Sequence, residues 1–563
     1  MKPITIGGGA AFFIDSAMAV PQLLGAGVDY ILLDYLAEGA MGLLGRMKKA
    51  DPQGGFPGDF MDVHIGPFLT QIAATGTKIM ANAGGVNPEA LAALLRARIA
   101  DLGLNIPVAV VTGDDLMDQL PDLADARDMF TGAPFPRQGV TSCNAYLGAF
   151  PIAKALADGA QIVLTGRVVD SALALGPLIH EFGWGAEDWD KLAGGTIAGH
   201  LIECGPQATG GTFTDWHQVE GWENIGAPMV ECFADGSCIV TKPEGTGGLV
   251  SRGTVAEQML YEVSDPQAYF VPDVTCDMSA VSIEEIGKDR VRVSGAKGYA
   301  PPATLKACVT WDDGWRATAY QPLIGPEARV RAEKQAKALF ARGNLMLRGR
   351  NMADWRRTEA VMIGSDTEII LKLAAEHDEM LGAQMFVREQ FAAISAMSPG
   401  TSVAFGPQVA PMMHLISFTV PRDRAVPRVN GVPCPDPARP AFCADDIERP
   451  SLPEAAPASA TATTLEALAF ARSGEKGETI NVGVIARNPA HLPALKRALT
   501  EQALRDWLPD LGDFRVTVYD LPGPAALNIV MDGALPGGLN ASQRFDPAAK
   551  TIAQRLMRFP VAL

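Results

Sequence analysis

Arg167 and Asp170 are the two residues whose types and spacing best suit chemistry in this chain. They follow a short apolar run at residues 162–164 and come just before an apolar helical pattern at residues 172–179. This order is typical of a buried parallel strand that leads into a helix, and ligands bind at the carboxyl ends of such strands. A guanidinium there can hold an anionic group, and a carboxylate can move a proton. The alternative is that the pair only fixes the turn and caps the helix.

Carboxylates follow other strand-like runs in the same way. Asp34 closes the apolar run at residues 30–34, and Glu38 stands four residues later, so the two would share one face of a helical turn. Such a pair suits acid–base work or a divalent cation, although it can equally be a solvated cap. Asp114 follows the run at residues 108–111. The catalytic candidates are therefore Asp34, Glu38, Asp114, Arg167 and Asp170.

Amides and glycines follow the remaining runs and are candidates for substrate binding. They can hydrogen-bond a carbonyl or hydroxyl group, or they can serve only as turn and cap residues. The terminal part of the chain adds a polar, Gly-rich loop at residues 471–481, whose lysine can reach a carboxylate or phosphate unless the loop is a plain surface turn. The predicted binding residues are Asn82, Gly84, Gly85, Asn87, Asn144 and Lys476. Because the ends of parallel strands share one rim, we expect a common polar pocket.

Three further features of the sequence are less specific evidence of function. Gly7-Gly8-Gly9 follows a strand pattern and either approaches a phosphate or forms a tight turn. Cys204 lies near His200 and is either a nucleophile or a buried thiol. The seven histidines show no spacing typical of metal ligands, so no structural zinc site is predicted. No metal-binding residues are assigned, and a divalent metal is an open but unsupported option.

The arrangement of elements predicts an α/β protein with several parts. Strands alternate with helices through residues 1–190, which predicts a mainly parallel sheet with flanking helices, Rossmann-like or barrel-like. Residues 191–420 form an α+β continuation, in which a helix begins after Pro326 and ends at Gly343. Residues 421–464 are a Pro-rich linker, semi-rigid or disordered, and residues 465–563 form a small α+β domain.

Composition limits the class of partner and the compartment. The chain has 563 residues and a net charge of -17, which argues against nucleic acid or an anionic membrane as the main partner. No apolar run approaches the ~20 residues of a membrane helix, and the start is too short and Gly-rich for a signal peptide. The eight cysteines contain no C-x-x-C pair. We expect a cytoplasmic protein with reduced thiols.

Several stretches resemble a known family. IGGGAAFFIDS, ANAGGVNPEA, TGRVVDSALALGPLIHEFGW and ECGPQATGG are similar to the acyclic terpene utilisation protein AtuA family. ARSGEKGETINVGVIAR and LPGPAALNIVM resemble the ferredoxin-like domain that follows it. The resemblance implies a role in breakdown of citronellol- or geraniol-like compounds, through branched acyl-CoA thioesters. It implies no catalytic residues. One difference is the first turn, where the family is closer to G-A-G-F.

Residues and resemblance together predict an enzyme that acts by acid–base chemistry on an acyl-CoA or related carboxylate. Water addition or removal and carbon–carbon cleavage beside the thioester both fit, with Arg167 holding an oxygen and Asp170 or Asp34 moving the proton. No cofactor is expected beyond the CoA-linked substrate. The alternative is a non-catalytic partner or scaffold of an acyl-CoA carboxylase or hydratase. A nucleotide-dependent ligase is a weaker option, since phosphate-binding motifs are absent. We expect a homo-oligomer.

Overall fold

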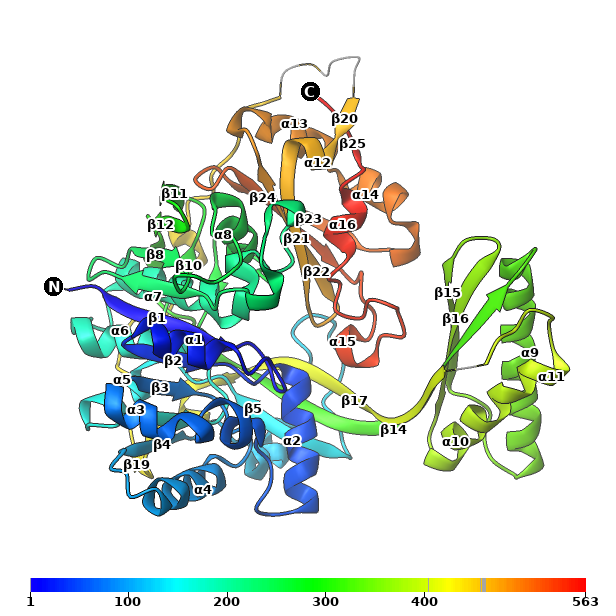
Figure 1. Cartoon of the computed structure of the whole chain (residues 1–563), viewed down its shortest axis with the longest axis horizontal. Helices are drawn as coiled ribbons and strands as arrows, with labels where there is room; N and C mark the ends of the chain where they lie inside the picture. Colours follow the sequence, from blue (N-terminus) through cyan, green and yellow to red (C-terminus); the bar gives the residue numbers. More distant parts are fainter. Residues whose placement is uncertain (1, 404, 456, 458–461) are drawn as a thin grey trace.

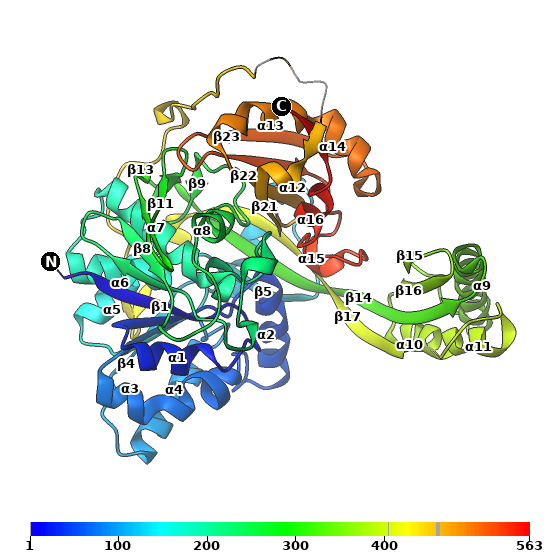
Figure 2. The ribbon, with the colours of Figure 1, turned by 45° about the horizontal axis from the view of Figure 1, so that its top comes forward.

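The computed structural model describes residues 2–403, 405–455, 457 and 462–563. It has three parts: an α/β body, a lobe that projects from it, and a terminal domain. Figures 1 and 2 show the terminal domain against the body, while the lobe extends away from both. Within the described residues, no helix has the length and apolar character needed to cross a membrane.

The body is built around the largest sheet of the described residues, which is mixed and not mainly parallel as predicted. Five neighbouring strands are parallel, and each strand added at either edge pairs antiparallel with its neighbour. The parallel strands, in spatial order, are β1 (Ile4–Ala10), β2 (Tyr30–Leu33), β3 (Lys78–Ala81), β6 (Ile162–Thr165) and β4 (Val108–Thr112). The strands added by antiparallel pairing are β7 (Met229–Cys232), β8 (Cys238–Thr241), β12 (Arg290–Ser294) and β11 (Ser282–Gly287) beyond β1, and β18 (Arg428–Val429) and β19 (Val432–Pro433) beyond β4. These additions pair backbone groups that a five-stranded sheet would leave open at its edges.

Helices cover both faces of this sheet, as the unbroken apolar strands require. Alternate residues of one strand enter opposite cores: Leu32 packs in one cluster, and Ile31 and Leu33 pack in the other. The first cluster contains α5 (Phe150–Ala157), α6 (Ala172–Phe182) and α7 (Trp189–Glu203). The second contains α1 (Ala19–Ala26), α2 (Glu38–Ala50), α3 (Leu69–Thr75) and α4 (Pro88–Asp101).

β5 (Val140–Ala145) is not part of the parallel series, contrary to the sequence-based expectation. It pairs antiparallel with β14 (Thr304–Ile324), so that Asn144 lies opposite Cys308. Its apolar pattern fits a buried strand in either orientation, and the partner is too distant in sequence to be read from the run itself.

β14 and β17 (Phe405–Pro421) continue from the body into the lobe. The lobe adds β15 (Arg357–Gly364), β16 (Glu368–His377), α9 (Ala328–Gly349), α10 (Met380–Glu389) and α11 (Ala393–Ala396). α9 does not stop at Gly343. A Cβ there would come within 2.6 Å of the Trp355 ring, so Gly343 permits close packing inside the helix and does not end it.

The expected linker is attached to the body over much of its described length. β18 and β19 extend the main sheet, and Arg439, which is 4% exposed at its side chain, donates to the Asp273 and Pro272 carbonyls. Part of the Ala/Ser/Thr run, residues 456 and 458–461, lies outside the described residues. Contacts with the body therefore hold the segment in place around β18, β19 and Arg439.

The terminal domain is a four-stranded antiparallel sheet with helices packed against it. Its strand order is β21-β22-β24-β23, formed by β21 (Ala469–Lys476), β22 (Thr479–Ala486), β24 (Ala526–Asp532) and β23 (Arg515–Leu521). Its helices include α13 (Leu492–Ala498), α14 (Glu501–Trp507) and α16 (Ile552–Leu556).

Buried polar contacts fix this domain to the body. Asn481 Nδ2 donates to the Leu260 carbonyl at 2.7 Å. The guanidinium of Arg472 lies 3.2 Å from the carboxylate of Glu257, with side chains 5% and 0% exposed. Because a buried charge without its partner is strongly unfavourable, this pair specifies one docked position.

Candidate functional site

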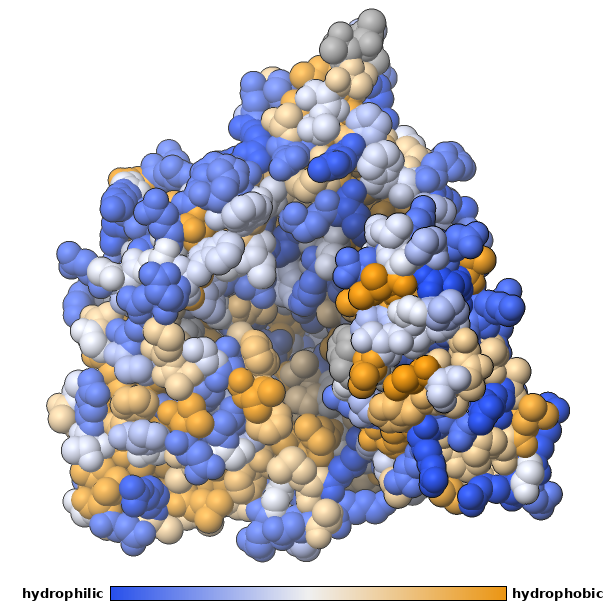
Figure 3. Space-filling view, turned by 45° about the vertical axis from the view of Figure 1, so that its right-hand side comes forward, coloured by the Kyte–Doolittle hydropathy of each residue, from blue (hydrophilic) through white to orange (hydrophobic). Residues whose placement is uncertain are grey.

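A cavity of about 600 Å³ lies where the body, the base of the lobe strands and the terminal domain meet. In Figure 3 a recess opens near the middle of the face, with apolar residues in its lower wall and hydrophilic residues above. The charged residues of the lining are Asp34, Glu38, Asp128, Arg167, Asp170, Glu203, Glu262, Lys306, Glu475, Lys476, Glu478 and Lys550. Leu36, Phe130 and Leu539 supply apolar surface. The cavity is therefore amphipathic.

Arg167 is positioned by contacts to its backbone and to its guanidinium. It follows β6, and its backbone N–H donates to Asp114 Oδ2 at 2.8 Å. Asn144 donates to the same oxygen at 2.8 Å. The guanidinium stacks 4.2 Å from the centroid of the Tyr146 ring and donates to Asp170 at 2.8 Å. Asp114 and Asn144 thus lie behind the pocket and orient Arg167, while Arg167 and Asp170 line it.

Asp34, directly after β2, is held as a buried acid. Its Oδ1 accepts from Asn82 Nδ2 and from the Leu36 N–H. Burial raises the pKa of Asp34 well above its ordinary value, and the Asp170 carboxylate raises it further, against the opposing effect of Arg167. A neutral carboxyl group facing a cavity can donate a proton to a bound molecule.

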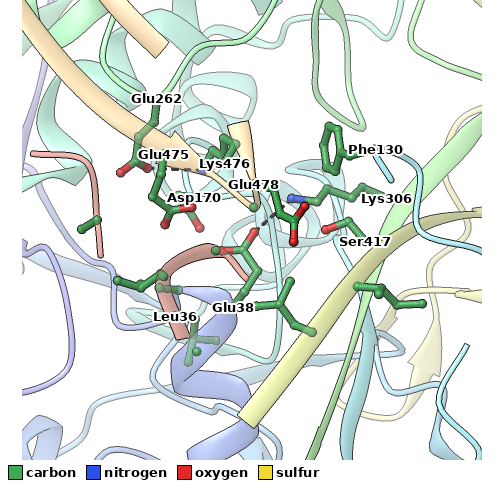
Figure 4. Close-up of a pocket in the computed structure, with 18 of the residues that line it drawn as sticks. Leu36, Glu38, Phe130, Asp170, Glu262, Lys306, Ser417, Glu475, Lys476 and Glu478 are labelled. Carbon is green, nitrogen blue, oxygen red and sulfur yellow. Dashed lines mark hydrogen bonds and ion pairs between the residues drawn. The ribbon is translucent and has the colours of Figure 1, made fainter. Parts of the chain in front are cut away.

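Glu38, the first residue of α2, is held as a charged carboxylate, in contrast to Asp34. Its Oε1 accepts from the Tyr146 hydroxyl at 2.6 Å and from Lys306 Nζ at 3.0 Å. Figure 4 shows Lys306 reaching across the pocket to this carboxylate. Burial alone raises the pKa of Glu38, but Lys306, Lys476 and Arg167 outweigh it, so the pKa lies well below its ordinary value. The helix N-terminus also favours a negative charge at this position.

The terminal domain completes the pocket with the tip of the β21–β22 hairpin. Lys476 Nζ lies 3.3 Å from Glu262, and Figure 4 shows both side chains above Glu38. Burial lowers the pKa of Lys476, but the carboxylates of Glu262, Glu38 and Asp170 outweigh it and keep the amine charged. Burial, with the nearby Glu262, raises the pKa of Glu475 to about 8. This hairpin therefore supplies a fixed cation and a second neutral acid.

The end of α7 forms another part of the wall. His200 Nδ1 lies 3.1 Å from Glu203 Oε1, and both side chains are buried. Burial, with the neighbouring Glu203 charge, raises the pKa of the Cys204 thiol well above its ordinary value. The thiol thus stays protonated, which disfavours Cys204 as a nucleophile, although it does line the cavity.

The remaining predicted binding residues lie outside the pocket lining. Asn87 donates to the Pro52 and Gly54 carbonyls, and Asn82 supports Asp34 from behind. Gly84 and Gly85 allow close packing: a Cβ at Gly84 would lie 2.4 Å from the Thr165 carbonyl oxygen, and Gly85 has a φ of +56°. Contact between these residues and a substrate stays a prediction without geometric support.

The Gly7-Gly8-Gly9 run lies inside β1 and does not form a turn. A Cβ at Gly8 would come within 2.0 Å of the Ile202 carbonyl oxygen. The run therefore lets α7 approach the strand closely, which is a packing role.

Sequence reasoning missed Lys306, Glu262, Glu475 and Lys550 as pocket residues. Glu475 adjoins Lys476 in the same polar, Gly-rich loop, so the loop was a usable signal. Lys306 lies within a long strand, and nothing in its local pattern indicates a site. Across the residues that the structure describes, no group of three or more His, Cys, Asp or Glu side chains is arranged to hold a metal ion.

Fold and pocket together define an α/β protein with an amphipathic cavity that a second, smaller domain completes. The chain belongs to the acyclic terpene utilisation family AtuA: the family model matches residues 4–431, and the model of the AtuA ferredoxin-like domain matches residues 463–562. This membership implies involvement in acyclic terpene utilisation.

Two other comparisons add little. The search of curated proteins gives no match. Among solved structures, the aspartate kinase of Clostridium acetobutylicum aligns over 99% of this chain and 100% of its own, at 7% identity and a TM-score of 0.17. That score carries no argument about fold or function.

Proposed function

We propose that the chain is a catabolic enzyme of acyclic terpene or branched-chain acyl-CoA degradation. Its chemistry would be acid–base, namely hydration, dehydration or carbon–carbon cleavage, on an acyl thioester or related carboxylate. The observation that carries the proposal is the opposite tuning of two carboxyl groups in one cavity. Burial raises the pKa of Asp34, whereas three cations hold that of Glu38 well below its ordinary value. Two carboxyl groups pushed apart in this way are typical of acid–base sites.

The cations of the pocket fit the oxygen of such a substrate. Arg167 and Lys476 are both kept charged by neighbouring carboxylates, so either can stabilise negative charge that develops on a thioester carbonyl or carboxylate. Asp34 would donate a proton to a leaving hydroxyl group or to the enolate carbon, and the ionised Glu38, or Asp170 beside Arg167, would accept one.

The apolar part of the lining fits the remainder of a branched chain. Leu36, Phe130 and Leu539 face the cavity together with the charged groups. A volume of about 600 Å³ lies within the range of about 300–1,000 Å³ that small-molecule sites occupy. The arrangement favours a ligand with one polar, oxygen-bearing end and one apolar end.

The test is turnover of branched acyclic acyl-CoA thioesters by the purified full chain, followed by mass spectrometry. We expect the gain or loss of one water, or a shortened thioester. Asp34→Asn keeps an oxygen for Asn82 but cannot donate an acid proton, so its rate should fall by about 10²–10⁴-fold. Asp122→Asn, whose side chain is 62% exposed on the surface, is the matched control. Full turnover by Asp34→Asn, or no change in any thioester, would contradict the proposal.

The second candidate function is a non-catalytic partner or scaffold of an acyl-CoA carboxylase or hydratase. The lobe favours it, because it projects from the body and exposes Ile324, Ile363 and Ile370 at 54%, 43% and 37%. Copurification with such an enzyme, together with no turnover by the isolated chain, would support this function over the first. The docked terminal domain, which completes the cavity, favours the enzyme.

A further inference from the structure

The lobe has no part in the acid–base chemistry proposed above, and its own helices pack against one face of its sheet. Leu371 of β16 points into the lobe core, together with residues of α9 and α10. Because side chains alternate along a strand, Lys372 and Glu376 lie on the other face. The strand register places Arg316 opposite Glu376 and Tyr320 opposite Lys372, so all four side chains share this second face.

A segment of the terminal domain, residues 537–550, reaches this second face, and we call it the wall segment. It contains α15 (Gly538–Ala541), which lies next to β17 in Figures 1 and 2, where the lobe strands leave the body. Lys372 Nζ donates to the carbonyls of Gln543 and Arg544, at 2.9 and 2.8 Å. One lobe amine thus binds two consecutive backbone carbonyls of the wall segment.

A second lobe cation, Arg316, makes the same kind of contact. Its guanidinium donates to the carbonyls of Ala541 and Ser542, at 2.6 and 3.1 Å, and pairs with Glu376 at 2.7 Å. Glu376 in turn accepts from Nε2 of the buried Gln543 at 2.6 Å. Hydrogen bonds to charged groups are stronger than those between neutral groups, so these contacts fix the backbone of the wall segment on the lobe.

Both ends of the wall segment line the cavity, on either side of the part that contacts the lobe. The lining residues are Gly537, Gly538, Leu539, Ala548 and Lys550. The strands that carry the lobe line the cavity as well, β14 at Lys306 and β17 at residues 414–417. The lobe is therefore connected to the cavity twice, through its own strands and through the wall segment.

We propose that the lobe is a clamp that holds the wall segment in place at the cavity, and that Lys372 and Arg316 are positioning residues for the ligand bound there. The two cations act through backbone carbonyls of the wall segment. Without these contacts, Leu539 and Lys550 are no longer held at the cavity, and a bound molecule loses part of the surface that encloses it. The inference gives the lobe a role, and it rests on the proposed function only where thioester kinetics are measured.

Lys372→Met tests the clamp, because it keeps an unbranched side chain and removes the amine. Hydrogen exchange of the full chain should become about tenfold faster or more within residues 537–550, the size expected when hydrogen bonds to a charged group are lost, and should not change in β22 or β24. The KM for a branched acyclic acyl-CoA thioester should rise while kcat changes little, because the wall segment binds the substrate and carries no proton-transfer group. Lys372→Arg can still donate to both carbonyls and should restore both values. Lys337→Met, at an exposed lysine of α9, is the matched control and should change neither.

Thiol labelling gives a readout that needs no turnover. Cys204 lines the cavity, whereas Cys443 is exposed. Labelling of Cys204 by N-ethylmaleimide, relative to Cys443, should be faster in Lys372→Met than in the native chain or Lys372→Arg, because a loosened wall segment admits the reagent. Since exchange and labelling use no substrate, a native chain that turns over no thioester would overturn the proposed function and not the clamp.

A variant on the other partner keeps the test informative if Lys372→Met folds poorly. Phe545, which is 43% exposed, has its ring centroid 6.1 Å from that of Tyr320 and 5.4 Å from Lys372 Nζ. Phe545→Ala should therefore cause the same changes in exchange, KM and labelling. Unchanged exchange within residues 537–550 in both variants would overturn the clamp. Faster exchange there, with KM and Cys204 labelling both unchanged, would overturn its role at the cavity.

Discussion

Asp114 gives a prediction whose size can be worked out from the contacts around it. It is 3% exposed, and its Oδ2 accepts from the Arg167 N–H and from Asn144 Nδ2, both at 2.8 Å. Asp114→Ala leaves these two donors buried and unpaired, at about 1–3 kcal/mol each, so the variant should lose about 2–6 kcal/mol. Asp114→Asn still offers an oxygen to both donors and should lose much less.

The pH dependence of Asp114→Asn has a definite sign. Burial raises the pKa of Asp114 from 3.8 to about 6 in the folded chain. The folded form therefore favours the protonated carboxyl group, and this contribution to stability is complete below pH 3.8 and is lost as pH rises through about 6. The difference corresponds to about 3 kcal/mol. Asn cannot ionise, so Asp114→Asn should gain stability relative to the native chain between pH 4 and pH 7.

Thermal melting of both variants and the native chain, at matched scan rates across this pH range, measures these effects. A stability difference between the native chain and Asp114→Asn that does not change with pH would refute the assigned burial of the charge. Equal stability of Asp114→Ala and Asp114→Asn would refute the two hydrogen bonds. Turnover should follow the same order, because Asp114 acts by positioning Arg167: a fall in kcat with Asp114→Ala should be rescued in Asp114→Asn.

Three further predictions concern the other parts of the molecule. Glu475 is protonated below about pH 8, so the affinity for an anionic thioester should fall as pH rises through that value. In Glu475→Gln the KM for the thioester should no longer change with pH in this range. Arg472→Met leaves the buried carboxylate of Glu257 unpaired and should lower the free energy of unfolding by about 3–5 kcal/mol, measured by faster proteolysis at the domain junction. Arg424→Met, on the surface, should cost about 0–1 kcal/mol. Gly343→Ala should destabilise the lobe by about 1–3 kcal/mol, seen as faster hydrogen exchange in α9, while Gly349→Ala, where nothing lies within 4 Å, should not.

The sequence was informative where a local pattern decides the structure. The strands that carry Asp34 and Arg167 are short apolar runs buried on both faces, and that pattern is sufficient to place polar groups at their carboxyl ends. Lys476 is recognisable because its loop concentrates charge and glycine between apolar runs. These three residues do line one cavity.

The other features depend on contacts between segments that are far apart in the sequence, and no local sequence pattern indicates such contacts. β5 has the same apolar appearance as the parallel strands but pairs with β14, far along the chain, which removes Asn144 from the shared rim. Lys306 enters the pocket through that same pairing, since β14 brings it beside Glu38. Gly343 illustrates the converse error, because a glycine in a helical pattern indicates a stop, whereas here the contact with Trp355 requires it.

The two halves of the pocket differ in what they contribute, and this difference bears on the order of events at the site. The body supplies the carboxyl groups of Asp34 and Glu38, together with Arg167. The terminal domain adds Lys476 and Lys550, both of which contact Glu262 of the body. The charged lining of the cavity is therefore complete only when the terminal domain is docked on the body. We expect a bound substrate to contact both sets of groups only in that arrangement.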